Sequence, residues 1–113
     1  MNQVKEKMEL IQTTFQEAKR IAIKESDLEN LNKALQNFPN EFISVAYEGA
    51  SMGVAIKSIE DTNSLKKWSD FYHYYGMKHS SQIHVGLGWA FSELDLVFSD
   101  FVIIAKTVSE CKI

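Results

Sequence analysis

The sequence is poor in residues that interrupt helices or crosslink a chain. Its 113 residues include one proline, five glycines and one cysteine. A β-sheet protein of this length needs turn residues about every 8–12 positions, so the scarcity of glycine and proline argues against one. The single cysteine, Cys111, cannot form an internal disulfide, which is typical of proteins from reducing compartments. We expect it to be an ordinary terminal thiol.

Other absences exclude whole classes of function. No stretch of about 18 apolar residues exists, so we expect no membrane-spanning helix. The N-terminal MNQVKEKMEL lacks the apolar run of a secretory signal. The net charge of -3 and the lack of a basic stripe argue against nucleic acid as a partner. We therefore expect a cytoplasmic protein, with delivery into a host cell without a cleaved signal as the alternative.

Motifs for cofactor or metal chemistry are also missing. The sequence has no glycine-rich phosphate loop and no HExxH or CxxC motif. His73, His79 and His84 lack the spacing of zinc ligands. We expect neither a cofactor nor a metal site.

Helical periodicity is what the sequence does contain. From Asn2 to Lys24, apolar residues alternate spacings of four and three in a heptad seam that ends in two alanines, where another helix can approach closely. The seam consists of Val4, Met8, Ile11, Phe15, Ala18 and Ala22. Ser26 and Glu29 fit a capping box before a second helix that Pro39 ends.

Three further helices are predicted, at about 41–59, 65–75 and 81–110. Gly76 fits a left-handed cap after the second of these. The third either continues to Glu110 or breaks near Asp95 to Asp100, and a strand at 100–105 is a rival interpretation. The sequence thus predicts an all-α protein, a compact bundle of five or six helices that forms one domain over residues 1–113.

The glycines inside predicted helices need a compensating contact, because each costs about 1 kcal/mol relative to alanine. Gly49 and Gly53 lie four residues apart, and Gly86 and Ala90 repeat that spacing. Small residues at this spacing let two backbones approach closely. We expect close contact between the helices at 41–59 and 81–110, with a ligand or partner backbone on the glycines as the alternative.

Glu48 and His84 lie beside these small residues and are the candidate acid–base pair. A buried Glu–His pair can tune a catalytic pKa. The alternative is a satisfied polar contact that sets the helix register.

The segment DFYHYYG, Asp70 to Gly76, is denser in aromatic residues than one helix face requires. Tyrosines offer rigid contact area with a polar tip, as protein-binding surfaces use. We therefore predict a partner-binding surface, and exposed tyrosines at a helix end are the alternative. Its residues are Trp68, Tyr72, His73, Tyr74 and Tyr75. We expect the two tryptophans, Trp68 and Trp89, to be core residues or interface anchors.

Two segments, VAYEGASMGVAI (45–56) and QIHVGLGWAFSEL (82–94), resemble paired motifs of a bacterial family of unassigned activity encoded beside enediyne biosynthesis genes. The shared motifs are EGA-x-M-[AG] and HVG-x-GWA. The resemblance covers roughly residues 42–94, and members of that family are much longer. It implies an accessory protein or enzyme of secondary-metabolite biosynthesis that uses Glu48 and His84.

In size, acidity and helical content the chain is also similar to small Legionella effectors that inhibit ubiquitin deamidases. That similarity implies a protein partner, a ubiquitin deamidase or transglutaminase effector. Our leading hypothesis is therefore a non-catalytic regulator, an inhibitor of a partner enzyme and not itself an enzyme. We also expect a homodimer, because the first helix and the segment from Val97 to Val108 are two apolar surfaces on one small domain.

Overall fold

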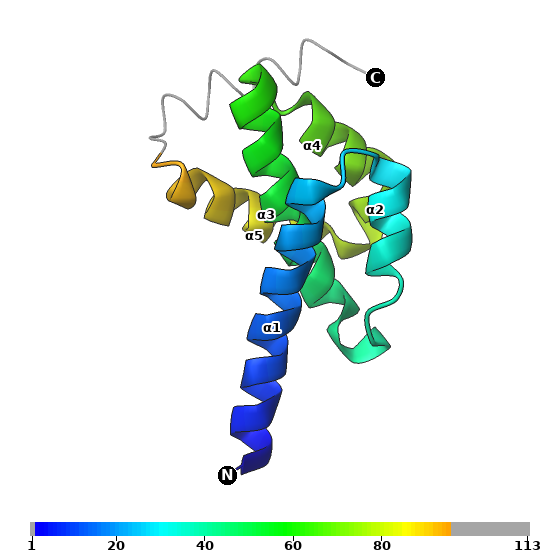
Figure 1. The fold of residues 1–113 in the computed structure, drawn as a ribbon, viewed down its shortest axis with the longest axis vertical. Helices are drawn as coiled ribbons and strands as arrows, with labels where there is room; N and C mark the ends of the chain where they lie inside the picture. Colours follow the sequence, from blue (N-terminus) through cyan, green and yellow to red (C-terminus); the bar gives the residue numbers. More distant parts are fainter. Residues whose placement is uncertain (1, 96–113) are drawn as a thin grey trace.

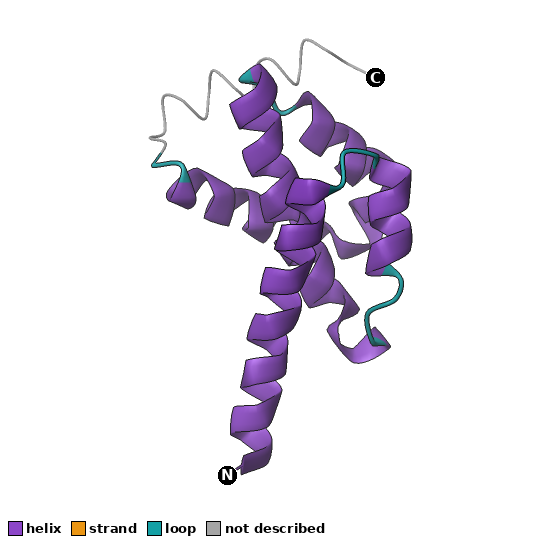
Figure 2. Ribbon diagram, in the orientation of Figure 1, coloured by secondary structure: helices purple, strands orange, loops and turns teal. Residues whose placement is uncertain are grey.

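The computed structural model describes residues 2–95 (Figure 1). Every regular element in this range is helical, which confirms the all-α class (Figure 2). The elements are α1 (Asn2–Lys24), α2 (Leu28–Leu35), η1 (Asn40–Phe42), α3 (Ile43–Thr62), α4 (Lys66–Phe71), η2 (Tyr72–Gly76), η3 (Met77–His79) and α5 (Ser80–Glu93). Within residues 2–95, none of the helices is long and apolar enough to cross a membrane. The expectations for the segments at 97–108 and 100–105 and for Cys111 lie outside the described residues.

The expected bundle of five or six helices needs correction, because only four described helices reach eight residues: α1, α2, α3 and α5. The helix predicted at 65–75 divides into the six-residue α4 and the π-helix η2, and the 3-10 turn η3 follows it. Gly76 has a φ of −106°, so the predicted left-handed cap is wrong. A Cβ at this position would overlap Cδ1 of Ile83, the end of a flexible side chain that can shift.

Two predicted helix boundaries also need correction. Asp27, and not Ser26, caps α2, because its Oδ1 accepts a hydrogen bond from the Asn30 backbone N–H at 2.9 Å. The continuous helix over 81–110 is wrong, since α5 ends at Glu93 and Asp95 has a left-handed φ of 55°. The break predicted near Asp95 is confirmed.

Helices α1 and α3 run side by side in the same direction (Figure 1). The segment that connects them contains α2, which runs in the opposite direction. Three contacts show the shared direction: Lys7 forms an ion pair with Glu41, Gly49 lies against Phe15, and Gly53 lies against Lys19. The sequence separation is the same in each pair, so the two helices keep one register along their contact.

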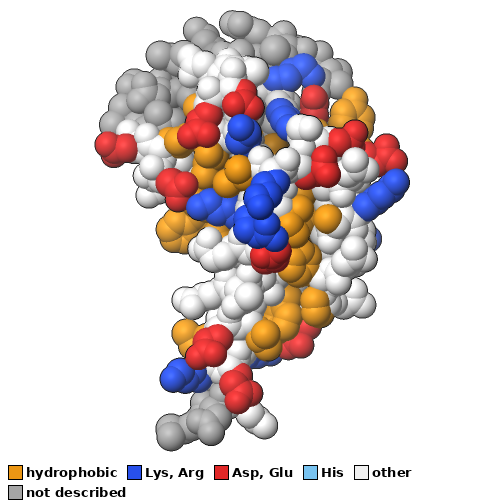
Figure 3. Space-filling model, in the orientation of Figure 1, with side chains coloured by type: hydrophobic (Ala, Val, Ile, Leu, Met, Phe, Trp, Pro, Cys, Tyr) orange, Lys and Arg blue, Asp and Glu red, His pale blue; other side chains and the backbone are white. Residues whose placement is uncertain are grey.

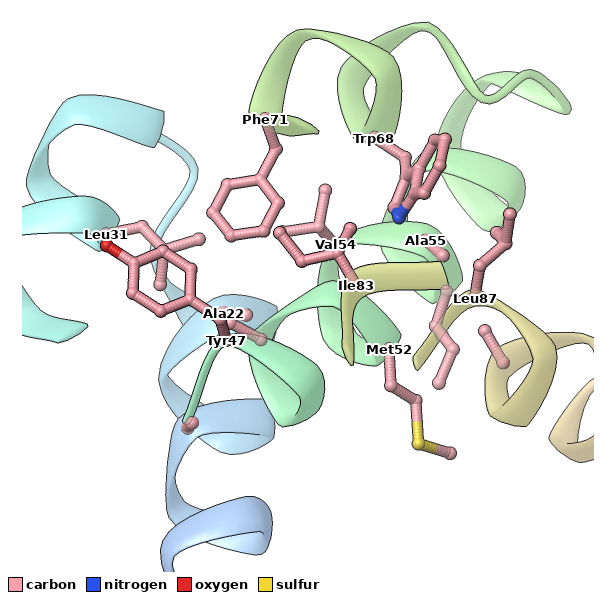
Figure 4. Packing of buried hydrophobic residues seen from close by; sticks show 14 of the residues in the cluster. Ala22, Leu31, Tyr47, Met52, Val54, Ala55, Trp68, Phe71, Ile83 and Leu87 are labelled. Atoms are coloured by element: carbon pink, nitrogen blue, oxygen red, sulfur yellow. The ribbon is translucent and has the colours of Figure 1, made fainter. Parts of the chain in front are cut away.

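Helix α3 forms the centre of the core, and all its residues from Gly49 to Ile56 are buried. Side chains from α3, α4 and α5 point toward one another around it, among them Val54, Phe71 and Ile83 (Figure 4). Ser51 Oγ accepts a hydrogen bond from Trp68 Nε1 at 2.8 Å and donates one to the Ile83 carbonyl at 2.5 Å. This buried polar chain joins the same three helices.

Candidate functional site

The paired glycines of α3 face α1, and not α5 as the sequence suggested. A Cβ at Gly53 would lie 2.7 Å from the Lys19 carbonyl oxygen and 2.8 Å from Ala22 Cβ, and one at Gly49 would overlap the Phe15 carbonyl. The partner assigned to these glycines was therefore wrong. The physical reason is that the alanines at the end of the α1 seam have small side chains, which let the α3 backbone pack closely against α1.

Contact between α3 and α5 is nevertheless close, as predicted, and it depends on Gly86. A Cβ there would overlap the Glu48 carbonyl oxygen and lie 2.8 Å from Ser51 Cβ. Ala90 is fully buried on the same face of α5. Gly88 differs, because a Cβ at that position would meet no atom within 4 Å.

A groove of about 710 Å³ lies where α1, α3 and α5 approach one another. Its apolar lining comes from Ile11, Phe15, Val45, Met52 and Trp89, and its polar lining from Gln12, Gln16, Lys19, Glu48 and Glu93. The α1 and α5 sides are joined by an ion pair in which Lys19 Nζ lies 3.1 Å from Glu93 Oε1. The groove is thus an apolar surface with charged and amide groups around it.

Trp89 and Glu48 are joined within this groove. The indole Nε1 donates a hydrogen bond to Glu48 Oε2 at 3.2 Å, although 52% of the Trp89 surface stays exposed. Burial raises the pKa of the Glu48 carboxyl, and the hydrogen bond from Trp89 opposes part of that rise. The carboxylate therefore holds a large, half-exposed aromatic ring in one orientation.

The candidate acid–base pair is not assembled. His84 and Trp89 lie five positions apart on α5, so they lie on different faces of the helix. His84 packs edge-on against Trp68 and Tyr72, with ring centroids 5.5 and 5.0 Å apart, and its Nδ1 donates to the Ser80 carbonyl at 2.8 Å. Within residues 2–95, no hydrogen bond or ion pair joins Glu48 to His84.

The predicted aromatic surface at 68–75 is divided between core and solvent. Trp68 is 7% exposed and Tyr72 is half-buried, stacked on Trp68 and hydrogen-bonded to Ser80 Oγ at 3.0 Å. Trp68 is therefore a core residue, which corrects its assignment to a docking surface, whereas Tyr72 packs beside it and keeps part of its surface exposed. Tyr75 is half-buried, so Tyr74, at 63%, and His73 are the exposed members.

A second, polar pocket of about 550 Å³ was not predicted from the sequence. Its lining comes from α2, η1, α3, η2 and η3 and consists of Asn32, Gln36, Asn40, Ile43, Ser44, Tyr47, Tyr74, Tyr75, Lys78 and His79. These residues are scattered over the sequence, and no motif joins them. The four-residue spacing of Asn32 and Gln36 on one helix face was the one available signal.

Tyr47 and His79 organise this pocket. The buried Tyr47 hydroxyl donates to Asn32 Oδ1 at 2.5 Å and accepts from Gln36 Nε2 at 2.7 Å. The His79 ring stacks on Tyr47 at 4.4 Å, and its Nδ1 lies 3.1 Å from Ser44 Oγ. Burial raises the pKa of the Tyr47 hydroxyl and lowers the pKa of His79, which the charge of Lys78 lowers further.

Among the described residues, no cluster of three histidine, cysteine, aspartate or glutamate side chains could hold a metal ion. Comparison with known families matches residues 1–111 to the family described as "Protein of unknown function (DUF1702)", and the chain belongs to this family. No curated protein and no solved structure matches the chain.

Proposed function

Because the chain belongs to a family without an assigned activity, we propose its function from the site alone: a non-catalytic protein-binding regulator. The partner docks on the groove formed by α1, α3 and α5 and on the adjoining N-terminal half of α1. The observation that carries this proposal is the exposed heptad seam, in which Val4 is 66%, Met8 59% and Ile11 37% exposed. Apolar residues at this spacing are typical of a helix that binds another chain.

The groove adds the features of a binding surface to that helix. Hydrophobic atoms reach the surface on both sides of α1, among charged side chains (Figure 3). Trp89 is held by Glu48, and tryptophan is enriched among residues that dominate binding energy because it buries a large rigid surface. Lys19 and Glu93 form the polar border that such interfaces carry.

The partner that we propose is an enzyme that modifies ubiquitin, a deamidase or transglutaminase effector, whose activity the protein inhibits. The support is the similarity in size, acidity and helical content to small Legionella effectors of that kind. A homodimer is the second association that we propose, since the exposed α1 seam is suited to pairing between copies.

Affinity capture on the full chain tests the proposal. Trp89 and Tyr74 are both half-exposed aromatic residues, but only Trp89 lines the groove. Trp89→Ala should weaken binding to the captured protein about thirtyfold, the effect of losing roughly 2 kcal/mol from a central anchor. Tyr74→Ala, the matched control, should bind as the wild type does. Equal affinity of the Trp89 variant would overturn the proposal.

A second candidate function, an accessory protein or enzyme of secondary-metabolite biosynthesis, is favoured by one observation. Glu48 lines the groove and has a raised pKa, as catalytic carboxyls often do. This candidate now depends on Glu48 without His84. Loss of the biosynthetic product with Glu48→Gln, while Trp89→Ala leaves partner capture unchanged, would select it over the regulator.

A further inference from the structure

The polar pocket between α2, α3 and the η2–η3 turn has a charge opposite to that of the whole chain. The protein has a net charge of -3, yet the residues that line this pocket include Lys78 and no aspartate or glutamate. Lys78 forms no ion pair within the described residues. The lining therefore offers positive charge and hydrogen-bond donors without a competing carboxylate.

The amide side chains of the pocket have unused hydrogen-bonding groups. Tyr47 engages Asn32 through its Oδ1 and Gln36 through its Nε2, so the Asn32 amino group and the Gln36 carbonyl oxygen remain available. The Asn40 side chain makes no hydrogen bond within residues 2–95. Asn32 is half-buried, while Gln36 and Asn40 are exposed. Amides with unused groups in a concave site can bind a polar ligand at little cost, because Asn32 and Gln36 are already oriented by Tyr47.

The rim of the pocket is formed by an unusual backbone. Residues 72–76 form a π-helix, a rare conformation that occurs frequently at functional sites. It places Tyr74 and Tyr75 at the rim, with ring centroids 6.4 Å apart and tilted by 57°. Two tyrosine rings and Ile43 give the pocket an apolar wall beside its polar floor.

We propose that this pocket binds a small aromatic acid, in which a carboxylate or phosphate group meets Lys78 and the amides while the ring lies against Tyr74 and Ile43. The pocket is lined by none of the groove residues, so the inference is independent of the protein-binding function. The oxygens of the acidic group accept hydrogen bonds from Lys78 and from the Asn32 amino group. The bond from Lys78 is charge-assisted, and such hydrogen bonds are stronger than neutral ones. The ring fills the apolar side.

Nuclear magnetic resonance titration of the full chain tests the pocket with defined probes. Benzoate and phenyl phosphate represent the two acidic groups, and benzamide is the neutral counterpart of benzoate. At least one acid should cause saturable shifts in the side-chain amides of Asn32, Gln36 and Asn40, with affinity about tenfold above that of benzamide. The acid that binds more tightly identifies the anionic group.

Lys78→Gln should remove most of that tenfold preference, and the residue is exposed, so the variant should fold. Lys57→Gln is the matched control, because Lys57 pairs with Asp61 on α3 and does not line the pocket. Three results would overturn the proposal: equal affinity for benzoate and benzamide together with no preference for phenyl phosphate, shifts confined to Trp89 and its groove, or no saturation by any probe up to about 10 mM. None of these results bears on partner capture by Trp89.

Discussion

The two halves of α1 continue one heptad seam but meet different surroundings. In the C-terminal half, Ala18 and Ala22 are at most 2% exposed, and Ala22 lies against Gly53 of α3. In the N-terminal half, Val4 and Met8 occupy equivalent seam positions and are more than half exposed. The periodicity is the same, and the side-chain volume differs.

This difference shows what residue size contributes beyond periodicity. Small residues let the backbones of α1 and α3 approach so closely that Gly53 has no room for a Cβ. Both sides of this contact belong to the same chain. The larger residues of the N-terminal half lie where no described helix covers them. The first set therefore specifies the fold, and we assign the second to association.

The largest expected effect comes from filling the intramolecular contact. Gly49→Leu should destabilise the protein by about 3 kcal/mol, because the obstacle is the Phe15 backbone, which cannot rotate away as a side chain does. Gly53→Leu should cost about 1–3 kcal/mol. Urea unfolding followed by circular dichroism measures both changes. Unaltered midpoints would show that α1 and α3 are not in close contact.

Substitutions in the exposed N-terminal half of α1 should change self-association and not stability. Met8→Glu should leave the free energy of unfolding of the monomer within about 0.5 kcal/mol of wild type, as expected for an exposed position. The same variant should weaken self-association at least tenfold, since a charge then faces an apolar seam. Light scattering over a range of concentrations measures the change. A wild type that is monomeric at micromolar concentration would refute the homodimer.

A glycine with free space around it should behave in the opposite way to Gly49. Gly88→Ala should stabilise the protein by about 0.5–1 kcal/mol, because a Cβ there meets nothing and alanine favours the helix. Thermal unfolding of the variant checks this expectation. A lower melting temperature would indicate that something occupies the space beside Gly88.

The smallest effect concerns the pH dependence at Glu48. Burial raises the pKa of this carboxyl in the folded protein, so the folded state binds the proton more tightly than the unfolded one. The resulting stabilisation is present below the ordinary value of 4.5 and is lost as the pH rises through the folded pKa. Glu48→Gln should therefore gain stability relative to wild type as the pH rises above 4.5. Parallel pH profiles of the urea midpoint would contradict the raised pKa.

The sequence predicted the helices with clear periodicity and the need for close packing at the glycines. It could not show which helix meets Gly49, because two helices offered small residues at the same spacing. The polar pocket could not be predicted from the sequence either, since Asn32, Ser44 and His79 come together only through tertiary packing. The π-helix was hidden because the spacing of Trp68, Tyr72 and Tyr75 fits an ordinary helix.

Trp68, which is hydrogen-bonded to Ser51 in the core, and Trp89, which is half-exposed, can serve as two separate fluorescence reporters. Trp68 is enclosed between α3, α4 and α5, so its fluorescence should be blue-shifted and should change only when that junction opens. Trp89 is half-exposed in the groove, so its red-shifted emission should respond to whatever binds there. One emission spectrum thus separates unfolding of the protein from occupation of its surface.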